Sequence, residues 1–412
     1  MASTPRIFQL LGTCNNYDWG KKGRNSLAAR MCEKATPAGF EIKDDEPYSE
    51  MWFGDYPDFP GRVAETGEPL AGHLGKHKEE LLGLKVVENF DAQLPFLPKI
   101  LSIAKALPLQ IHPNKQLSER LHQEQPDKFT DPNHKPEIAV ALSKFEVFAG
   151  WKSVSQISPL FMTPVLAQFV PSATKEWTND TLRHVVCKLL KADEETVRAV
   201  ENEIAKLSKE DLRKTIGEDY MADLIPRLQM DYGSTDPGTL VALLCMNFLV
   251  LEPGEALYIP ADGIHAYLSG DIVECMARSN NVLNVGFCPH ADRDNADLFT
   301  ETLSFGPNTK GDVTLPRQKS NAGVKGRTSV YRPPIREFDM LRIDLGPDED
   351  EEIQALEGPG IAIVTHGTGT LHGDHEEIAV KEADILYVAP QVQTRWRTSS
   401  ELQVHMAVVG LP

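Results

Sequence analysis

Side chains able to bind a metal ion occur in three short apolar runs that lie far apart in the chain. Gln110 and His112 are two residues apart in a run bounded by prolines. Residues two apart on a β-strand point to the same face, so this amide and imidazole would leave one wall side by side. Glu137 opens a second run, and His265 lies in a third. Together they form a nitrogen and oxygen set that suits one divalent metal ion.

The chemistry of this set indicates what kind of metal site it would form. Two neutral imidazoles, one carboxylate and one amide leave a divalent ion with residual positive charge. Structural zinc sites usually carry thiolates and are closed, whereas histidine and carboxylate sites with an open position are catalytic. Such an ion orients substrate oxygens and stabilises developing negative charge as a Lewis acid. Taken singly, the three pieces also fit a surface pair, a solvated strand start and a hydrogen-bonded core histidine.

The sequence around these residues resembles one family over nearly the whole chain. The matching segments are Asn-Tyr-Asp-Trp-Gly at 16–20, Pro-Tyr-Ser-Glu-Met-Trp-Phe-Gly at 47–54, Leu-Pro-Phe-Leu-Pro-Lys-Ile-Leu-Ser at 94–102, Gln-Ile-His-Pro-Asn-Lys at 110–115, His-Lys-Pro-Glu at 134–137, Phe-Ala-Gly-Trp at 148–151, His-Ala-Tyr at 265–267 and Gly-Asp-Ile-Val-Glu-Cys-Met-Ala at 270–277. The chain is similar to the type I phosphomannose isomerases (mannose-6-phosphate isomerases), which are zinc enzymes of the cupin superfamily.

The resemblance implies an activity and a set of site residues. The enzyme would be an intramolecular oxidoreductase that interconverts mannose 6-phosphate and fructose 6-phosphate and supplies mannose for GDP-mannose synthesis. The resemblance also implies that one zinc ion per chain is bound by Gln110, His112, Glu137 and His265. We expect the substrate to be bound by Lys99, Trp19, Arg278 and Asn284, and the other basic candidates for its phosphate are Lys115, Lys135, His290 and Arg293.

Isomerisation needs a base that carries a proton between C2 and C1 of the sugar through a cis-enediol. Lys135 lies two residues before Glu137 and would face the same way on a strand. Glu274 follows a turn-like stretch at 269–271, and a hairpin there would bring its carboxylate back beside the metal. Apolar neighbours would raise the pKa of that carboxylate, as a base near neutrality requires. We therefore assign proton transfer to Glu274 and Lys135, with an ion pair between Glu274 and Arg278 as the structural alternative.

One departure from the family opens a second interpretation. Asn284 stands where the family usually carries a catalytic arginine. An arginine is always charged and binds an oxyanion with two hydrogen bonds, whereas asparagine offers only neutral ones. The alternative function is therefore a paralogue that binds a sugar phosphate without the usual catalysis, or with altered specificity. A third candidate, an iron oxygenase on the same fold, would use a histidine and carboxylate triad, and Gln110 as a fourth ligand counts against it.

The elements that must position these residues are mainly strands, interrupted by one helical block. We expect tandem cupin (jelly-roll) β-barrels with an α-helical insertion. The strand and turn pattern at 252–261 recurs weakly at 379–390 without a histidine behind it, so the second barrel is expected to be structural. The expected domains are the first part of the catalytic barrel at 1–153, the helical insertion at 154–246, the second part of that barrel at 247–307, and a linker with the C-terminal jelly roll at 308–412.

Composition excludes several other classes of protein. The chain has 412 residues and a formal net charge of −18, which argues against nucleic acid or an anionic membrane as a partner. Its six cysteines show no C-x-x-C spacing, so neither a cysteine zinc site nor a disulfide framework is indicated. No apolar run approaches the roughly 18 residues of a membrane span. We expect a cytoplasmic monomer whose partner is a small sugar phosphate.

Overall fold

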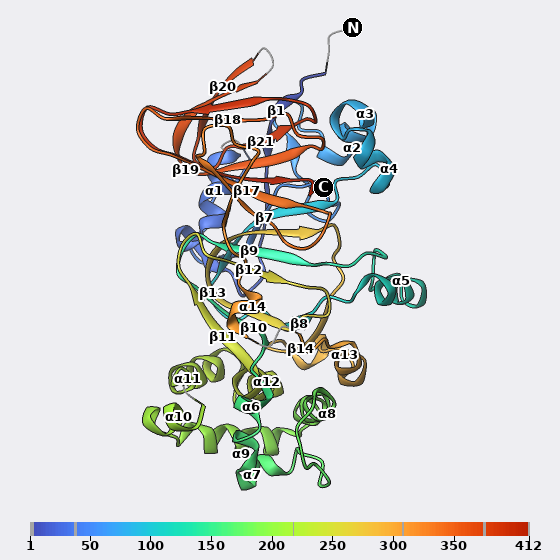
Figure 1. Ribbon diagram of the computed structural model, residues 1–412, viewed down its shortest axis with the longest axis vertical. Coiled ribbons are helices and arrows are strands. Elements are labelled where there is room, and N and C mark those ends of the chain that lie inside the picture. Colours follow the sequence, from blue (N-terminus) through green and yellow to red (C-terminus); the bar gives the residue numbers. More distant parts are fainter. Residues whose placement is uncertain (1–3, 37–38, 217, 307–308, 374–375, 411–412) are drawn as a thin grey trace.

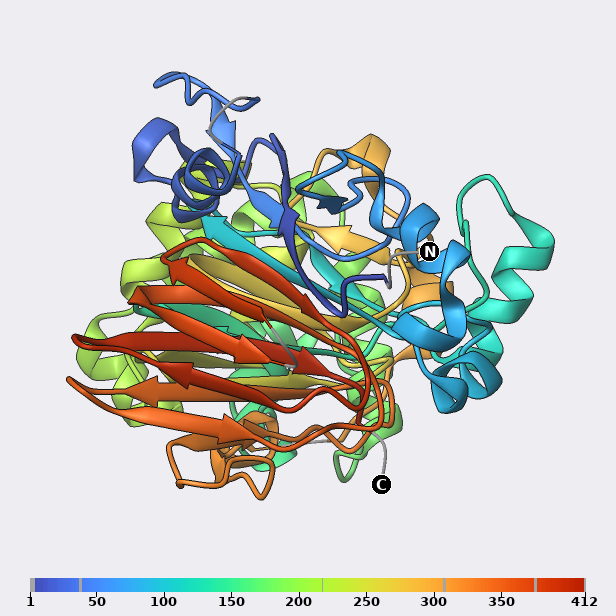
Figure 2. The same ribbon diagram turned by 90° about the horizontal axis from the view of Figure 1, so that it is seen from above.

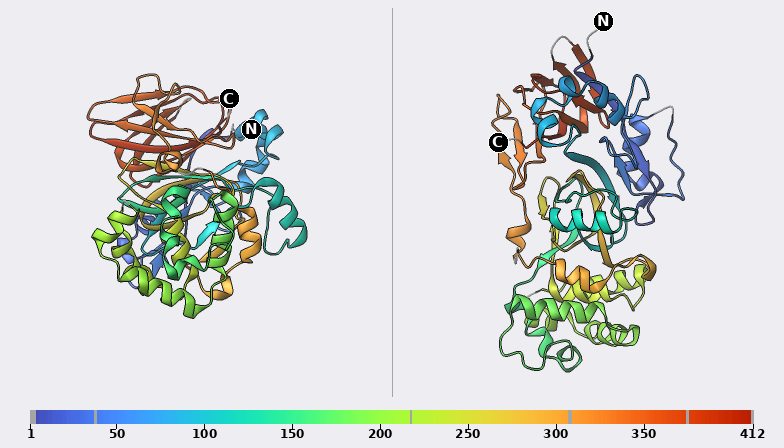
Figure 3. Two further views of the ribbon diagram at one scale, coloured as in Figure 1. Left: turned by 60° about the horizontal axis from the view of Figure 1, so that its bottom comes forward. Right: turned by 90° about the vertical axis from the view of Figure 1, so that its right-hand side faces the viewer.

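The chain folds into two antiparallel β-barrels with a block of helices at one end. The computed structural model describes residues 4–36, 39–216, 218–306, 309–373 and 376–410. In Figure 1 the helical block lies at the bottom, one sheet occupies the middle and the C-terminal strands lie at the top. Figure 3 shows the same three parts following one another along the long axis. The predicted fold class, mainly β with tandem jelly rolls and a helical insertion, is confirmed.

The middle sheet forms the barrel that carries the candidate metal ligands. Its strands are runs of β-branched and aromatic residues closed by proline, glycine or polar turns. The main path runs β11-β10-β13-β7-β5-β2, and β8, β9, β12 and β14 pair alongside it. The ten strands are β2 (Thr13–Asn15), β5 (Glu50–Trp52), β7 (Phe96–Ile103), β8 (Leu109–Ile111), β9 (Glu137–Ala141), β10 (Phe145–Trp151), β11 (Met246–Leu251), β12 (Ala256–Ile259), β13 (His265–Ala277) and β14 (Leu283–Gly286).

One long strand of this barrel differs from the sequence-based expectation. The stretch 269–271 was expected to be a turn between two hairpin arms, but β13 is continuous through it. Gly270 has φ +125°, and a Cβ atom there would lie 2.7 Å from the Lys144 carbonyl oxygen. Only glycine fits this close approach, which lets the strand bend around the barrel without ending. The bend allows β13 to pair with β8 and β10 in its first half and with β7 and β9 in its second.

The predicted helical insertion is present, and side-chain caps mark the start of two of its helices. The Asp193 side chain accepts a hydrogen bond from Thr196 N at the start of α9, and Asp236 caps α12, which has Pro237 at its first turn. Leucine and valine residues at helical spacing form the core between these helices and the barrel. The helices of this block are α6 (Val154–Ile157), η2 (Leu160–Met162), α7 (Pro164–Ala167), α8 (Asn179–Leu190), α9 (Glu194–Ala205), α10 (Lys209–Ile216), α11 (Met221–Tyr232) and α12 (Pro237–Cys245).

The second barrel is built mainly from the C-terminal strands, which Figure 2 shows from above as a layered orange and red sheet. Two strands from the first part of the chain join it, because β1 pairs with β21 and β6 pairs with β1. The domain boundaries drawn from the sequence stay a prediction. They place both strands within residues 1–153, although β1 pairs with a strand of the second barrel. The eleven strands are β1 (Ile7–Leu11), β6 (Arg62–Val63), β15 (Gln318–Lys319), β16 (Thr328–Tyr331), β17 (Asp339–Leu345), β18 (Asp350–Ile353), β19 (Gly360–Gly373), β20 (Glu376–Lys381), β21 (Ile385–Val388), β22 (Thr394–Arg397) and β23 (Leu402–Val408).

Short helices and one small two-stranded sheet complete the described part of the chain. No helix within it is both long and apolar enough to cross a membrane. The remaining elements are β3 (Lys21–Lys22), η1 (Gly23–Asn25), α1 (Leu27–Ala35), β4 (Pro47–Tyr48), α2 (Leu70–Lys76), α3 (Lys78–Leu81), α4 (Leu84–Asn89), α5 (Lys115–Glu124), η3 (His290–Asp292), α13 (Ala296–Thr302) and α14 (Lys310–Val313).

Candidate metal centre

The four side chains singled out by type and spacing meet inside the first barrel. Glu137 lies between the two imidazoles, with Oε2 3.4 Å from His112 Nε2 and Oε1 3.2 Å from His265 Nε2. The Gln110 amide nitrogen lies 3.3 Å from His265 Nε2. The potential ligand atoms of His112, Glu137 and His265 all lie within 4.8 Å of one another, and all three residues are buried. Three distant parts of the chain thus converge on one point.

Strand pairing explains why they converge. Gln110 on β8 is the register partner of His265 at the start of β13, so their side chains leave the same face. Further along the same strand, Met276 pairs with Glu137, the first residue of β9. His112 follows directly after β8, and its carbonyl oxygen accepts a hydrogen bond from Asp262 N at 2.7 Å. The register of β13 thus fixes β8 through its first residue and β9 through its second half.

The outer nitrogens of both histidines are already hydrogen bonded, which leaves the inner ones available to a metal. His112 Nδ1 donates to the Asn281 carbonyl oxygen at 2.9 Å, and His265 Nδ1 donates to the Gly263 carbonyl oxygen at 3.0 Å. A metal-binding histidine is commonly fixed in this way, with its second N–H donated to a backbone carbonyl. His112 Nε2 is buried and has no hydrogen-bond partner, an arrangement that is costly unless something else satisfies the atom. The site therefore fits a metal ion with nitrogen and oxygen ligands.

The protonation states also suit a metal. Burial lowers the pKa of His112 to about 4, so its imidazole is neutral at pH 7. Burial alone would raise the pKa of Glu137, but the two histidines hold it well below its ordinary value. The Tyr267 hydroxyl donates a hydrogen bond of 2.7 Å to Glu137 Oε1 and fixes the orientation of the carboxylate. An ionised carboxylate between two imidazole nitrogens is the ligand chemistry that zinc takes in catalytic sites.

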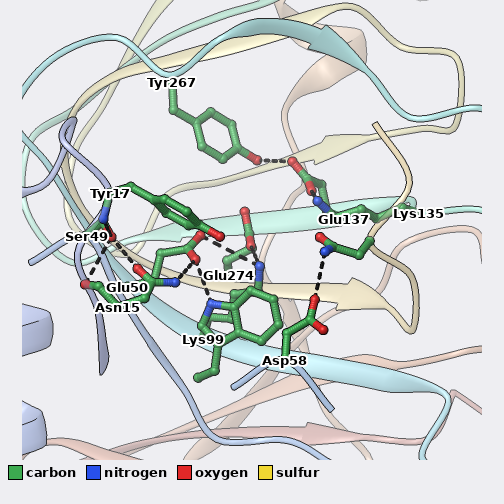
Figure 4. A network of polar contacts seen from close by, with 12 residues as sticks. Asn15, Tyr17, Ser49, Glu50, Asp58, Lys99, Lys135, Glu137, Tyr267 and Glu274 are labelled. Carbon is green, nitrogen blue, oxygen red and sulfur yellow. Dashed lines mark hydrogen bonds and ion pairs between the residues drawn. The ribbon is translucent and has the colours of Figure 1, made fainter. Parts of the chain in front are cut away.

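A buried network of charges lies beside this centre, and Figure 4 shows its members turned toward the same space as Glu137. Lys99 Nζ lies 3.7 Å from Glu50 Oε1 and 3.4 Å from Glu274 Oε2, and it stacks over the Trp52 ring at 4.1 Å. Burial and the charge of Glu137 raise the pKa of Glu274 to about 7. That carboxyl group can therefore both accept and donate a proton near neutral pH.

The structure places the remaining predicted residues in different ways. Lys135 is partly buried, with 12% of its side chain exposed and Nζ 4.0 Å from Glu137 Oε2, and desolvation lowers its pKa. Asn284 on β14 is the register partner of Gln110, and its buried side-chain oxygen has no hydrogen-bond partner. Trp19 is buried in an apolar cluster and stacks with Tyr17, with ring centroids 5.9 Å apart.

Two predicted arginines each form an ion pair with a carboxylate. Arg278 forms an ion pair with Asp55 in the barrel wall and packs over the Tyr56 ring, so the alternative pairing with Glu274 is not observed. Arg293 Nη2 lies 2.9 Å from Asp236 Oδ2. Arg293 lines a cavity of about 850 Å³ with Val285, the neighbour of Asn284, and with His290.

Sequence reasoning missed several residues that shape the site. Glu50 lies inside a matching segment, but nothing in its spacing connected it with Lys99. Tyr267 follows His265 by two residues on the same strand, a spacing that could have indicated a shared face. Asn281 acts through its backbone carbonyl, which any residue type offers, so no sequence signal could have identified it.

Comparison with known proteins gives this geometry a family. The family model for the catalytic domain of type I phosphomannose isomerase matches residues 7–154, and the model for the C-terminal part matches residues 329–376. The mannose-6-phosphate isomerase of Ogataea parapolymorpha is 34% identical over 408 residues, covering 95% of both chains. The chain belongs to the type I phosphomannose isomerase family. It is therefore an enzyme of an isomerase family, in agreement with the resemblance seen in the sequence.

Other members and solved structures extend the match over nearly the whole chain. The mannose-6-phosphate isomerase of Schizosaccharomyces pombe is 35% identical and covers 92% of this chain and 94% of its own. That of Bos taurus is 32% identical and covers 93% of both. A zinc-bound crystal structure of mannose 6-phosphate isomerase covers 99% of this chain and all of its own, with a TM-score of 0.82 and 23% identity. The apo form from Salmonella typhimurium has the same TM-score and 24% identity. The tandem-barrel fold of this family is thus shared.

Proposed function

We propose that this protein is a zinc-dependent isomerase that interconverts mannose 6-phosphate and fructose 6-phosphate and supplies mannose for GDP-mannose synthesis. The observation that carries the proposal is the convergence of His112 Nε2 and His265 Nε2 on Glu137. The Nδ1–H group of each histidine donates a hydrogen bond to a backbone carbonyl oxygen, which leaves Nε2 to face the centre. The curated relatives named above are mannose-6-phosphate isomerases, and one structure of the same fold holds zinc. One zinc ion per chain, held by these residues and Gln110, would act as a Lewis acid toward substrate oxygens.

We assign proton transfer and substrate binding to the residues around this centre. Glu274 carries the proton between C2 and C1 through a cis-enediol, since its raised pKa keeps both protonation states accessible. Lys99, held between Glu50 and Glu274, supplies a buried positive charge beside that carboxylate. Lys135 lies on the metal side of the network and is proposed as the second proton-handling group. Trp19, Lys99, Arg278 and Asn284 remain the proposed substrate-binding residues.

The alternative, a paralogue with weakened or redirected catalysis, is favoured by one specific observation. Asn284 faces the same side as Gln110, and the described arginines nearest in sequence, Arg278 and Arg293, are paired with Asp55 and Asp236. Neither guanidinium is therefore free to replace the arginine that the family usually carries. An Asn284→Arg variant should accordingly gain activity toward mannose 6-phosphate. An unchanged rate would mean that another group already fills this role.

A coupled isomerase assay on zinc-loaded protein tests the proposal. The unaltered chain should convert mannose 6-phosphate, and Glu274→Gln should lower kcat by a factor of about 10²–10⁴. Zinc content measured on the same samples should be unchanged, because Glu274 is not a proposed ligand. No conversion by zinc-loaded protein would favour the paralogue, and iron with oxygen uptake would favour the oxygenase. A cytoplasmic location and a monomeric state belong to the same proposal, and cell fractionation and sedimentation would check them.

A further inference from the structure

The second barrel makes a direct contact with the segment that leads into the metal centre. Glu337 lies between β16 and β17, and its Oε1 accepts a hydrogen bond of 2.6 Å from His134 Nε2. Both side chains are largely shielded from solvent, with 24% of His134 and 16% of Glu337 exposed. Burial alone would raise the pKa of Glu337, but His134 holds it below its ordinary value. This is a charge-assisted contact in a partly dry setting, where such bonds are strongest.

Local hydrogen bonds and a buried neighbour hold Glu337 in place independently of its contact with His134. Its second oxygen, Oε2, accepts a hydrogen bond from the Arg336 backbone N–H at 3.1 Å. The preceding turn is closed by a bond from Ile335 N to the Pro333 carbonyl oxygen at 2.9 Å, and proline restricts its backbone. The next residue, Phe338, is fully buried in the core of the second barrel. The carboxylate is thus presented from a rigid base, so it can orient another group at little entropic cost.

His134 lies where its position affects the proposed ligands. It precedes Lys135, and three residues later the chain reaches Glu137 at the start of β9. Burial raises the pKa of Asp262, and the nearby His134 opposes this rise. Asp262 in turn donates its backbone N–H to the carbonyl oxygen of His112. His134 thus lies in the segment that leads to Glu137, and it also lies near Asp262, whose backbone N–H holds the carbonyl oxygen of His112.

We propose that Glu337 is a positioning residue of the active site, acting through His134 on the segment that carries Lys135 and Glu137. This inference rests on the proposed function, and it gives the second barrel a role in the reaction of the first. Groups that hold metal ligands from behind affect metal affinity or activity by about 10–100-fold when removed. Glu337 belongs to this class although it is far away in the sequence. It lies 203 positions from His134, its hydrogen-bond partner.

A second contact between distant parts of the chain provides the matched control. Glu382 Oε1 binds Lys34 Nζ at 2.6 Å and joins the second barrel to α1. Like Glu337 it is a carboxylate of the C-terminal part, but 33% of it and 48% of Lys34 are exposed, and α1 carries no proposed site residue. If interdomain ion pairs contribute only to docking, the Glu337→Ala and Glu382→Ala variants should behave alike. If Glu337 positions the site, only its variant should alter zinc retention and turnover.

The test measures zinc release to a colorimetric chelator and steady-state kinetics with mannose 6-phosphate. Glu337→Ala should release zinc about tenfold faster and lower kcat about tenfold with little change in KM. Glu337→Gln, which keeps the size and one hydrogen-bonding oxygen, should lie between it and the unaltered chain. Glu382→Ala should match the unaltered chain. His134→Ala combined with Glu337→Ala should be no worse than His134→Ala alone, because the two groups act as a pair.

The outcomes separate this inference from the proposed function. Zinc release and kcat equal to those of the unaltered chain in both Glu337 variants would overturn the inference. So would an equal effect of Glu382→Ala, or fully additive effects of the two substitutions at His134 and Glu337. A chain that holds zinc but lacks isomerase activity overturns only the proposed function, since zinc release still reports on Glu337. A chain that holds no zinc overturns both.

Discussion

Each barrel buries a histidine whose Nε2 has no hydrogen-bond partner, and comparing the two shows what makes one of them a candidate ligand. His112 in the first barrel and His405 on β23 in the second are at most 1% exposed. Burial lowers the pKa of both, to about 4 for His112 and about 3 for His405. Residue type, burial and pKa therefore do not distinguish them.

The surroundings of the two histidines distinguish them. His112 Nε2 faces a carboxylate that a second imidazole also faces. His405 Nδ1 contacts the Thr365 hydroxyl at 3.0 Å, and the charge of Arg342 adds to burial in disfavouring its protonation. Within the described residues, His112, Glu137 and His265 form the one group of three or more His, Cys, Asp or Glu side chains close enough to hold a metal ion. A buried histidine becomes a candidate ligand only where other donors converge on it.

The first prediction removes a donor from the convergent site and has the largest expected effect. His265→Ala deletes one imidazole and leaves Glu137 without one of its two histidine partners. Loss of a bound Lewis acid costs several kcal/mol of transition-state stabilisation, so kcat/KM should fall by about 10³ or more. Metal analysis and the coupled assay on one preparation measure this. His405→Ala is the matched variant, and it should retain zinc and turnover at 25 °C. Equal losses in the two variants would contradict the comparison.

The second prediction concerns the core of the second barrel. Trp396 on β22 is fully buried among apolar side chains of that barrel. Trp396→Ala should lower the free energy of unfolding by about 3–5 kcal/mol, because a large cavity replaces the ring. Denaturant unfolding measures the loss, and zinc content and kcat of the folded fraction at 25 °C should stay unchanged. A fall in kcat without a change in stability would show that the second barrel acts on catalysis through its core.

The third prediction uses the depressed pKa of His405. Its folded-state pKa of about 3 lies below the ordinary value of 6.5, so the unfolded chain binds this proton more readily. Its contribution to stability is therefore present above about pH 6.5 and is lost as pH falls toward 3. Between pH 7 and pH 5 the loss from this group is of order 2 kcal/mol. His405→Gln should be less sensitive to acid than the unaltered chain over this interval, as unfolding at both pH values would reveal. Equal sensitivity would contradict the assignment.

The same two regions show how far sequence could predict the fold and the site. The strand runs and the helical block followed from the periodicity of the apolar residues. The ligand candidates followed from residue type and from spacing of two on a strand. Both are local signals, and local signals are present in a single sequence.

What the sequence could not supply depends on long-range pairing. The stretch 269–271 has turn-like composition, yet Gly270 bends a continuous strand there because it must pass close to Lys144. β1 joins the second barrel although it belongs to the first part of the chain. Glu50 reaches Lys99, and Glu337 reaches His134, only through the register of distant strands and the packing of one barrel on the other. These contacts carry no spacing that can be read along the chain.

The smallest predicted effect comes from residues that follow β12 in the first barrel and β21 in the second, at the ends of the two similar strand-and-turn segments. Asp262 follows Pro260 by two residues with φ 62°, and Gln391 follows Pro390 directly with φ 59°. Such a conformation costs a residue with a Cβ atom about 1–2 kcal/mol relative to glycine. In the second barrel only the backbone of Gln391 has a described hydrogen bond, from its N–H to the Leu356 carbonyl oxygen, so Gln391→Gly should raise the free energy of unfolding by about 1 kcal/mol.

At Asp262 in the first barrel, the loss of side-chain hydrogen bonds should outweigh the relief of backbone strain. The Asp262 carboxylate accepts hydrogen bonds of 2.8 Å from Asn114 N and 2.6 Å from Asn114 Nδ2, two residues beyond His112. Asp262→Gly removes both bonds, so it should destabilise the protein and speed the release of zinc, whereas Gln391→Gly leaves zinc release unchanged. Paired unfolding and chelator measurements on the two variants decide the point. A net gain in stability from Asp262→Gly would mean that its strained backbone costs more than its side chain contributes, and that the first barrel holds His112 without this support.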